Sequence, residues 1–533
     1  MNTRRKLLFV LSLITMSIAG VEARAQHTTS RTYGSINFMA PVETDLDSDR
    51  PVISGDGDWI AFDSIASVLV MGDSNNAQDV FISDLSHPGA FLVSVDSAGN
   101  QGNADSFSPD VSEDGNWVAF ASNASNLIPG DTNELTDIFL HDIATGLTTR
   151  VSVDSAANQA NGRSLRPSIS DDGRYVAFES VADNLVAGDS NGVADVFVHD
   201  CLTGATIRVS VGSTGVQGNG PSVAPSIDGS GDLVAFTSEA RNLVPGDGNG
   251  VADVFVRDIA MATTRRISES VLGGDANGPS DRPAISHSGS YVSYASAASD
   301  IVLLDTNAAT DIFLHDLATS SNSRVSLTWA GGEANGDCYG SAVSNSGRVV
   351  FSSTATNLVL GDSNACGDIF ARDPSAALTV RISVDSAGGE ANAASYHPDL
   401  SASGCDFAFS SDASNLVGGD SNGARDIFHH RHASFCVTLA TAPLIADLGG
   451  LLTLSSGGGV PYERLAIFVV ALDNVPFFGF PLFAKYDATG FYSVTLIVPG
   501  DPAISGHLAT FQAFTPCPGC GLNTSNLRYT YFQ

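Results

Sequence analysis

The sequence predicts an all-β protein: a seven-bladed β-propeller followed by a small β-sandwich domain. Three observations support this prediction. A motif of about 58 residues recurs seven times, each copy holds four segments with the alternation of β-strands, and no segment after the N-terminal leader shows a convincing helical period. Propellers are built from repeated four-stranded blades, so seven copies correspond to seven blades.

Residues 1–25 have the pattern of a secretory signal peptide. Residues 4–6 form a basic start, residues 7–18 form a short apolar core, and Ala23 and Ala25 precede a cleavage site. We therefore expect a secreted protein, periplasmic or extracellular after cleavage near Ala25. The apolar core is too short to span a bilayer and no later stretch is long enough, so no membrane span is expected.

The repeat is marked by an acidic loop whose first Asp recurs in steps of 57 or 58 residues. A second marker, a Pro before a short apolar run, recurs with the same period at positions such as Pro109 and Pro167. The copy at residues 166–211 shows the four strands as "RPSIS", "RYVAFES", "DVFVHD" and "IRVSV". Asp-Gly between the first two of these is a strong hairpin signal.

The two ends of the repeat array predict how the ring closes. The last copy has no clear fourth strand after "DIFHH", whereas the segment "GSINFM" (Gly34–Met39) upstream of the first copy has a strand pattern. We predict that this N-terminal strand completes blade seven, because closure removes two unpaired strand edges. The propeller is then expected to span residues 26–436.

Residues 437–533 no longer follow the repeat. Five apolar segments separated by Gly and Pro turns, among them "LAIFVVALD" and "HLATFQAFT", predict a β-sandwich. Aromatic residues such as Phe477 and Phe480 could line a carbohydrate or partner surface, but core packing is the commoner role of such residues.

The segment "PSISDDGRYVAF" and its copies carry a resemblance to a known family. Pro, Ser, an Asp-Gly turn and an apolar pair with Phe resemble the TolB-type, WD-like β-propeller repeat of exported bacterial proteins. The resemblance covers about three quarters of the chain and implies the propeller fold. The family includes partner-binding propellers and the propeller halves of peptidases, but the α/β-hydrolase domain usually attached in those peptidases is absent from this sequence.

The charge of the chain limits its partners. Lys and Arg number 25 against 58 Asp and Glu, a net charge of −33, which becomes −36 without the leader. Such a chain repels nucleic-acid phosphates and anionic membranes, so neither is an expected partner. We expect a monomer that binds a protein or a cell-envelope component.

All seven copies share the pattern Asp-x-Asn-x-x-x-Asp in the loop between the second and third strands. Side-chain oxygens at this spacing resemble half of a Ca²⁺ loop, and calcium takes six to eight oxygens. The alternative is turn chemistry, in which the Asp and Asn side chains bond local N–H groups. A cation would offset the repulsion between the two carboxylates, so we hypothesise weak Ca²⁺ sites formed by Asp73, Asn75, Asp79, Asp131, Asn133, Asp137, Asp189, Asn191, Asp195, Asp247, Asn249, Asp253, Asp305, Asn307, Asp311, Asp362, Asn364, Asp368, Asp420, Asn422 and Asp426.

No catalytic residue is predicted. The sequence "GDSNG" at 188–192 matches the G-x-S-x-G nucleophile elbow, but no helix follows Ser190 and no His recurs near it. The run "HHRH" (residues 429–432) is expected at the surface rather than in a metal site. A binding or scaffold protein is therefore favoured; the alternatives are a propeller lyase or hydrolase with a site on the central face, and a Ca²⁺-stabilised surface structural protein.

Two further expectations concern pairs of residues. An Asp at the end of the third strand and an Arg at the start of the fourth, such as Asp142 and Arg150, should form ion pairs across a hairpin. Seven cysteines in an exported protein suggest disulfides. Loops on the same face of the propeller predict the bridges Cys338–Cys366 and Cys405–Cys436, with Cys201 free and Cys517 and Cys520 forming "CPGC" in the C-terminal domain.

Overall fold

The computed structural model describes residues 46–87 and 89–432 in full, together with the backbone of strands β1 and β29–β36. The chain divides into two units, one of which spans Thr28–Cys436 while the other includes Val437–Gln533. Within the described residues, no helix is long and apolar enough to cross a membrane. The leader expected at residues 1–25 lies outside this part.

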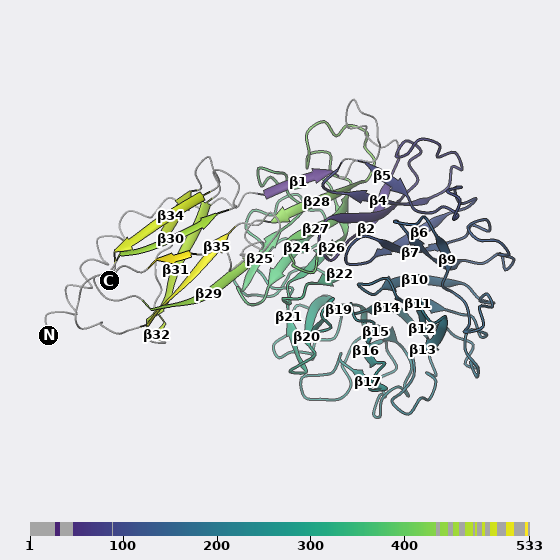
Figure 1. Ribbon diagram of the computed structural model, residues 1–533. Coiled ribbons are helices and arrows are strands. Elements are labelled where there is room, and N and C mark those ends of the chain that lie inside the picture. Colours follow the sequence, from purple (N-terminus) through teal and green to yellow (C-terminus); the bar gives the residue numbers. More distant parts are fainter. Residues whose placement is uncertain are drawn as a thin grey trace. The chain divides into compact units, whose positions relative to one another are not determined.

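The first unit is a seven-bladed β-propeller, as the repeat predicts (Figure 1). In blades one to six, four antiparallel strands follow one another in sequence and in the sheet. The strands are β2 (Ser48–Ile53), β3 (Trp59–Ser64), β4 (Asp79–Asp84) and β5 (Ala90–Leu92) in blade one; β6 (Ser106–Val111), β7 (Trp117–Ser122), β8 (Asp137–Asp142) and β9 (Thr148–Arg150) in blade two; β10 (Ser164–Ile169), β11 (Tyr175–Ser180), β12 (Asp195–Asp200) and β13 (Ala205–Arg208) in blade three. They continue as β14 (Ser222–Ile227), β15 (Leu233–Ser238), β16 (Asp253–Asp258) and β17 (Thr263–Arg266) in blade four; β18 (Ser280–Ile285), β19 (Tyr291–Ser296), β20 (Asp311–Asp316) and β21 (Ser321–Arg324) in blade five; β22 (Cys338–Val343), β23 (Val349–Ser353), β24 (Asp368–Asp373) and β25 (Leu378–Arg381) in blade six.

Blade seven joins strands from both ends of the unit. Its sheet order is β1 (His27–Arg31), β28 (Asp426–His432), β27 (Asp406–Ser411) and β26 (Ser395–Leu400), so an N-terminal strand is its outermost member. The strand in this position is His27–Arg31. The segment Gly34–Met39, to which we assigned the role from sequence, lies outside the described residues.

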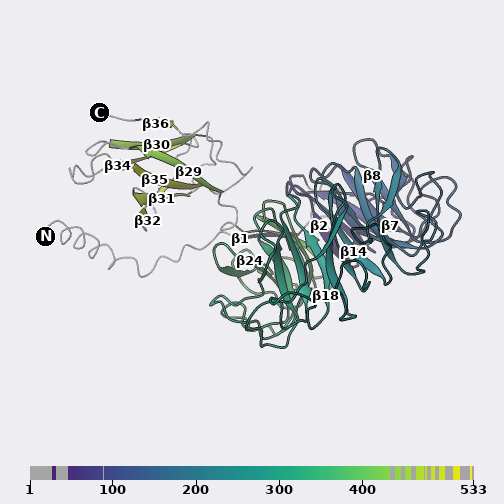
Figure 2. The same cartoon turned by 90° about the horizontal axis from the view of Figure 1, so that it is seen from below.

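The first strand of each blade is the innermost one. The first strands of neighbouring blades contact one another around the whole ring, from β2 to β6 and onward to β26 and back to β2, and so surround its central axis, called the channel below (Figure 1). Figure 2 shows the same sheets from a direction turned by 90°. Each of these inner strands carries a β-bulge or irregularity, which locally bends a strand and redirects its side chains.

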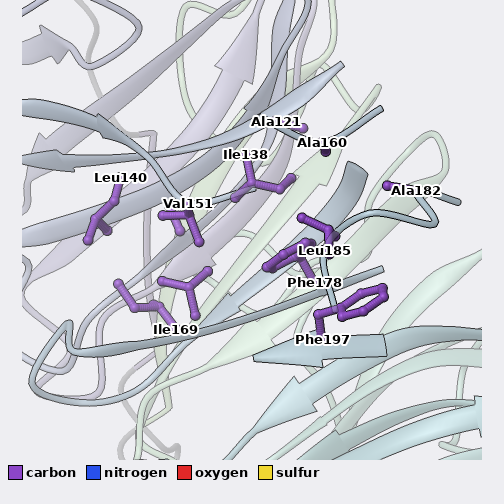
Figure 3. Close-up of a cluster of buried hydrophobic side chains, with 12 residues drawn as sticks. Ala121, Ile138, Leu140, Val151, Ala160, Ile169, Phe178, Ala182, Leu185 and Phe197 are labelled. Carbon is purple, nitrogen blue, oxygen red and sulfur yellow. The ribbon is translucent and has the colours of Figure 1, made fainter. Parts of the chain in front are cut away.

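The apolar core is divided into seven clusters, each of which lies between neighbouring blades. In the cluster of Figure 3, Ile138 and Val151 of blade two pack with Ile169 and Phe178 of blade three. Phe178 also stacks on Phe197 within its own blade at a centroid distance of 5.9 Å. A blade cannot bury its faces alone, which explains why the ring needs all seven copies.

The second unit contains two antiparallel sheets. One is formed by β29 (Thr438–Ile445), β35 (Leu508–Thr515), β31 (Arg464–Leu472), β32 (Val475–Pro476) and β33 (Leu482–Lys485). The other is formed by β34 (Phe491–Ile497), β30 (Leu451–Gly457) and β36 (Arg528–Thr530). A β-sandwich made of these sheets stays a prediction.

Candidate functional site

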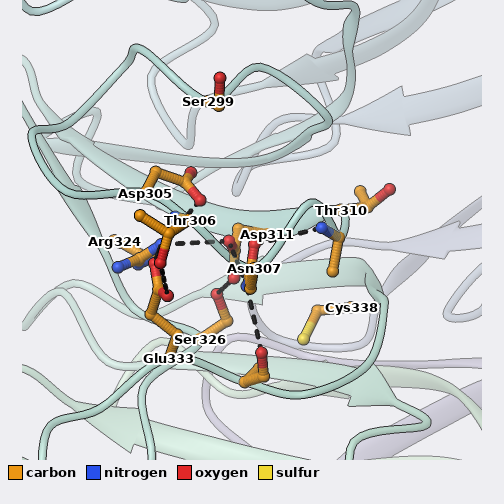
Figure 4. Close-up of polar contacts among 12 residues, drawn as sticks. Ser299, Asp305, Thr306, Asn307, Thr310, Asp311, Arg324, Ser326, Glu333 and Cys338 are labelled. Carbon is orange, nitrogen blue, oxygen red and sulfur yellow. Dashed lines mark hydrogen bonds and ion pairs between the residues drawn. The ribbon is translucent and has the colours of Figure 1, made fainter.

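The acidic loops, each running from the first to the second Asp of the repeated pattern, connect the second and third strands of every blade. Figure 4 shows the loop of blade five, Asp305–Asp311. Asn307 Oδ1 accepts the backbone N–H of Ala309 at 3.1 Å, which is the expected Asx turn. The same turn occurs in every blade, from Asn75 with Ala77 to Asn422 with Ala424.

The second Asp of the loop is buried and holds several donors at once. Asn307 Nδ2 donates to Asp311 Oδ2 at 2.9 Å, and Ser326 Oγ donates to Asp311 Oδ1 at 2.5 Å. Ser326 Oγ in turn accepts the N–H of Ile312 at 3.1 Å. A Ser or Thr could not accept all of these hydrogen bonds, and this explains why the position is Asp in every copy.

An arginine from the fourth strand binds both carboxylates of the loop. In blade five, Arg324 Nη1 lies 3.1 Å from Asp305 Oδ1 and 3.3 Å from Asp311 Oδ2 (Figure 4). The Arg324 side chain is only 9% exposed. Four other blades repeat the arrangement with Arg150, Arg208, Arg266 and Arg381.

A third side chain completes the loop in blades four to six. Asp275, Glu333 and Glu390 contact the arginines of their blades at 2.7–2.9 Å. Side-chain hydrogen bonds from its neighbours lower the pKa of Glu390 to about 2. Blade one has Leu92 in place of the arginine, and there Gln101 Nε2 donates to Asp73 Oδ1 at 2.8 Å and to Asp79 Oδ2 at 2.9 Å.

These contacts decide how well the loops suit calcium. The Asn side chain turns its amide nitrogen toward the buried Asp, its oxygen is engaged by the backbone, and in five blades a guanidinium contacts both carboxylates. Among the residues that the structure describes, no group of three or more His, Cys, Asp or Glu side chains is placed to hold a metal ion. The repulsion that motivated the calcium hypothesis is therefore offset by arginine in those blades, and calcium binding by the loops stays a prediction.

The prediction that an Asp of the third strand pairs with an Arg of the fourth strand is wrong. In blade two, Arg150 lies opposite Phe139 at the end of β9, next to the acidic loop. Asp142 instead accepts hydrogen bonds from the N–H groups of Ala144 and Thr145 in its own turn. The fourth strand ends at the arginine rather than beginning there, so the two charges lie at opposite ends of the hairpin.

The predicted bridge between Cys338 and Cys366 is also wrong, because both are free thiols. Cys338 takes the place of a Ser that pairs with the last Ser of the second strand in other blades, and its Sγ lies 3.2 Å from Ser353 Oγ. Cys366 belongs to the acidic loop of blade six, where its N–H donates to Asn364. Cys201 is free as expected, and Cys436, Cys517 and Cys520 lie outside the described residues.

Two other sequence motifs find ordinary structural roles. Ser190 of "GDSNG" is exposed and its Oγ lies 3.4 Å from Gln217 Oε1. The "HHRH" run forms the second half of strand β28, and its histidines alternate. His430 and His432 are buried, whereas His429 is partly exposed and lies 3.0 Å from Asp406. The expectation of a surface run is therefore wrong for the two buried histidines, which lie on a strand flanked on both sides.

The inner strands provide the functional candidates that the sequence analysis missed. Their first, fourth and sixth positions are buried with few exceptions and vary little between blades, whereas the second, third and fifth positions keep some exposure. The third positions, called bulge positions below, hold Arg50, Ser108, Arg166, Ala224, Arg282, Gly340 and His397. The fifth positions hold Val52, Asp110, Ser168, Ser226, Ala284, Ala342 and Asp399.

Two fifth positions carry carboxylates in a setting that disfavours charge. Asp110 Oδ2 accepts the N–H of Ile169 at 2.8 Å, and Asp399 Oδ2 accepts the N–H of Ile53 at 2.9 Å. Burial raises the pKa of each carboxyl group to about 6. Ser168 makes the corresponding contact in blade three, where its Oγ accepts the N–H of Ile227 in the next blade at 3.2 Å. The fold therefore does not require a carboxylate at this position.

Comparisons with known proteins identify no family for the chain. No family model and no curated protein matches the chain. A protein from Agrobacterium tumefaciens assigned as TolB is 16% identical, with 52% of this chain and 80% of that chain covered at a TM-score of 0.33. A puromycin-hydrolysing peptidase from Mycobacterium tuberculosis is 13% identical (81% and 64% covered, TM-score 0.43), and the tricorn protease is 13% identical (73% and 33% covered, TM-score 0.41). These similarities do not extend to what this chain binds.

Proposed function

We propose that this protein is a secreted, non-catalytic binding module whose partner, a protein of the cell envelope, enters the central channel. One observation carries the proposal. The blades have the same or similar residues where side chains are buried or form the acidic loops, and different residues at the partly exposed positions of the inner strands around the channel. The ring requires only the backbone conformation at the bulge positions, so the Arg, Ser, Ala, Gly and His side chains found there are available to a partner.

The carboxylates of the channel strengthen this argument. Asp110 and Asp399 have pKa values raised to about 6 by burial, so their ionisation at neutral pH opposes folding. Ser168 and Ser226 make the corresponding hydrogen bonds without that penalty. Groups that reduce stability and are not needed for the fold are candidates for function.

The acidic loops have a different role in this proposal. Their side chains bond to one another and to neighbouring loops, as when the N–H of Thr306 donates to Glu333 at 2.8 Å. They therefore stabilise the rim around the channel, and the partner is selected by the channel residues.

Photo-crosslinking tests the proposal. A photoreactive amino acid replaces, one at a time, four small channel residues in the protein expressed in its organism of origin: Ser108, Ala224, Ala284 and Ala342. Four exposed alanines on the loops serve as matched controls: Ala98, Ala156, Ala187 and Ala387. We expect a shared crosslinked protein from channel positions and not from the controls. No product at any channel position, or the same products at both sets, would overturn the proposal.

A further inference from the structure

Three channel residues stand out because basic side chains are scarce. Both lysines of the chain lie outside residues 46–432, so arginine and histidine supply every cation of the described propeller. Arg50, Arg166 and Arg282 occupy the bulge positions of blades one, three and five. Ser108 and Ala224 stand between these arginines in blades two and four, and Gly340 and His397 separate Arg282 from Arg50 in blades six and seven.

The backbone at these arginines directs their side chains. Each precedes a proline, and each has a positive φ: 48° at Arg50, 50° at Arg166 and 51° at Arg282. This left-handed conformation costs about 1–2 kcal/mol for a residue other than Gly. The strain is shared by Ser108 and Ala224, with φ of 52° and 51°, so it belongs to the bulge and not to the arginine. The fold requires the bulge but leaves open which side chain it presents.

Arg50 and Arg166 each form an ion pair with a buried carboxylate of the second strand. Arg50 Nη1 lies 3.4 Å from Asp63 Oδ2, and the exposed fractions of the two side chains are 47% and 0%. Asp63 Oδ2 also accepts the N–H of Ser108 at 3.0 Å, which fixes the carboxylate. The guanidinium of Arg50 therefore covers its counterion and is itself about half exposed, so it can still contact a ligand.

Blade three repeats this arrangement. Arg166 Nη1 lies 3.1 Å from Glu179 Oε2, with exposed fractions of 59% and 9%. Glu179 Oε2 accepts the N–H of Ala224 in the next blade at 2.8 Å. Arg282 in blade five is 67% exposed and lies 3.9 Å from Asp281 Oδ2, its nearest carboxylate partner.

We infer that Arg50, Arg166 and Arg282 bind the carboxylates of an acidic peptide segment of the partner; this inference rests on the proposed function. The planar guanidinium matches a carboxylate with two parallel hydrogen bonds. The neighbouring inner-strand positions Leu165 and Val223 keep some exposure and provide aliphatic surface for apolar peptide side chains. A hydroxyl-rich sugar chain would gain little from such a surface.

The negative net charge of the chain opposes the approach of an acidic ligand. A charge of −33 repels an acidic ligand at long range, so binding depends on direct contact with the guanidinium groups. At physiological salt the screening length is about 8 Å, which weakens the distant repulsion more than the contacts. The test is therefore run at that ionic strength.

The experiment uses the full chain and a phage-displayed library of random dodecapeptides as probe. We expect the selected peptides to be enriched in Asp and Glu. Their affinity should fall at least tenfold in the variant R50S/R166S/R282S, and replacement of their acidic residues by Asn and Gln should have the same effect. Serine is chosen because Ser108 adopts the same backbone conformation at this position.

A matched variant controls for the loss of positive charge. Arg163, Arg241 and Arg265 are exposed and lie outside the inner strands, so R163S/R241S/R265S makes the same change in net charge elsewhere. This variant should bind the selected peptides with unchanged affinity. Equal losses in both triple variants would show a general charge effect and overturn the inference.

The remaining outcomes separate the inference from the proposed function. Selected peptides without acidic enrichment, bound equally well by R50S/R166S/R282S but lost when Ala224 is replaced by Trp, would overturn the arginine site and leave the channel as the binding site. A library that yields no peptide above background would count against both.

Discussion

Replacement of Arg266 by Met tests whether the arginine holds the acidic loop together. Its side chain is 2% exposed and contacts three carboxylates: Asp275 at 2.7 Å, Asp253 at 3.4 Å and Asp247 at 3.6 Å. Removing one partner of a buried ion pair leaves the other charge uncompensated and typically reduces stability by about 3–5 kcal/mol. For a unit of roughly 400 residues unfolding together, with about 2.1 cal/mol/K of unfolding entropy per residue, this lowers the Tm by about 4–6 °C.

The pH dependence of the loss identifies its cause. Burial raises the pKa of Asp247 and of Asp253, and Arg266 opposes that rise. Without the arginine both pKa values rise further above their values in the unfolded chain. Above the raised pKa the ionised carboxylates reduce the free energy of unfolding by the full amount, and this loss disappears as the pH falls toward the pKa of the unfolded chain. R266M should therefore lose more stability at pH 7.5 than at pH 4.5.

The assay is thermal or urea unfolding of R266M beside R265M, which replaces the adjacent arginine. Arg265 is exposed on the same strand, and its loss should change stability by no more than about 0.5 kcal/mol. Equal Tm values for the two variants, or a loss in R266M that is the same at both pH values, would refute the role assigned to the arginine.

Three further predictions follow from the same contacts. Millimolar Ca²⁺ should not raise the Tm beyond the shift given by Mg²⁺ at matched ionic strength, because the Asn oxygens and most of the carboxylates are already engaged. A Ca²⁺-specific shift removed by chelator would support the calcium hypothesis. Asp110→Ser should stabilise the protein by up to about 3 kcal/mol at pH 7.5 and not at pH 4, since a carboxyl group whose pKa is raised to about 6 opposes folding only where it ionises. A variant no more stable than wild type at pH 7.5 would contradict this. Under non-reducing digestion, peptides containing Cys338 and Cys366 should appear unlinked, and a bridged pair would show that the Ser-like role assigned to Cys338 is mistaken.

The sequence carried enough information for the ring and its blades, because both the repeat period and the strand alternation are local patterns. Blade three shows the limit of such patterns. "IRVSV" alternates as a strand should, yet the strand paired with β12 ends at Arg208. The end of a strand depends on its hydrogen-bonded neighbour, which periodicity does not describe, and so Arg150 and its equivalents were assigned the wrong partners.

The channel residues were missed for a different reason. Repetition drew attention to positions that are the same in all blades, and those turned out to be held by internal hydrogen bonds and ion pairs. The signal that could have revealed the channel was the residue before each repeated Pro, which reads Arg, Ser, Arg, Ala, Arg and His across six blades. Its exposure on an inner strand became evident only from the sheet order.

The central claim is that different residues carry stability and binding. The most direct measurement is the affinity of selected acidic peptides, taken well below the melting temperature, together with the Tm, for R266M and for R50S/R166S/R282S. We predict that R266M melts at lower temperature and binds like wild type. The triple variant should bind at least tenfold more weakly. Its Tm should also fall, because the buried Asp63 and Glu179 lose their counterions, and this is why its affinity is taken below its melting temperature. If R266M lost affinity, or the triple variant kept it, the separation of roles would be contradicted.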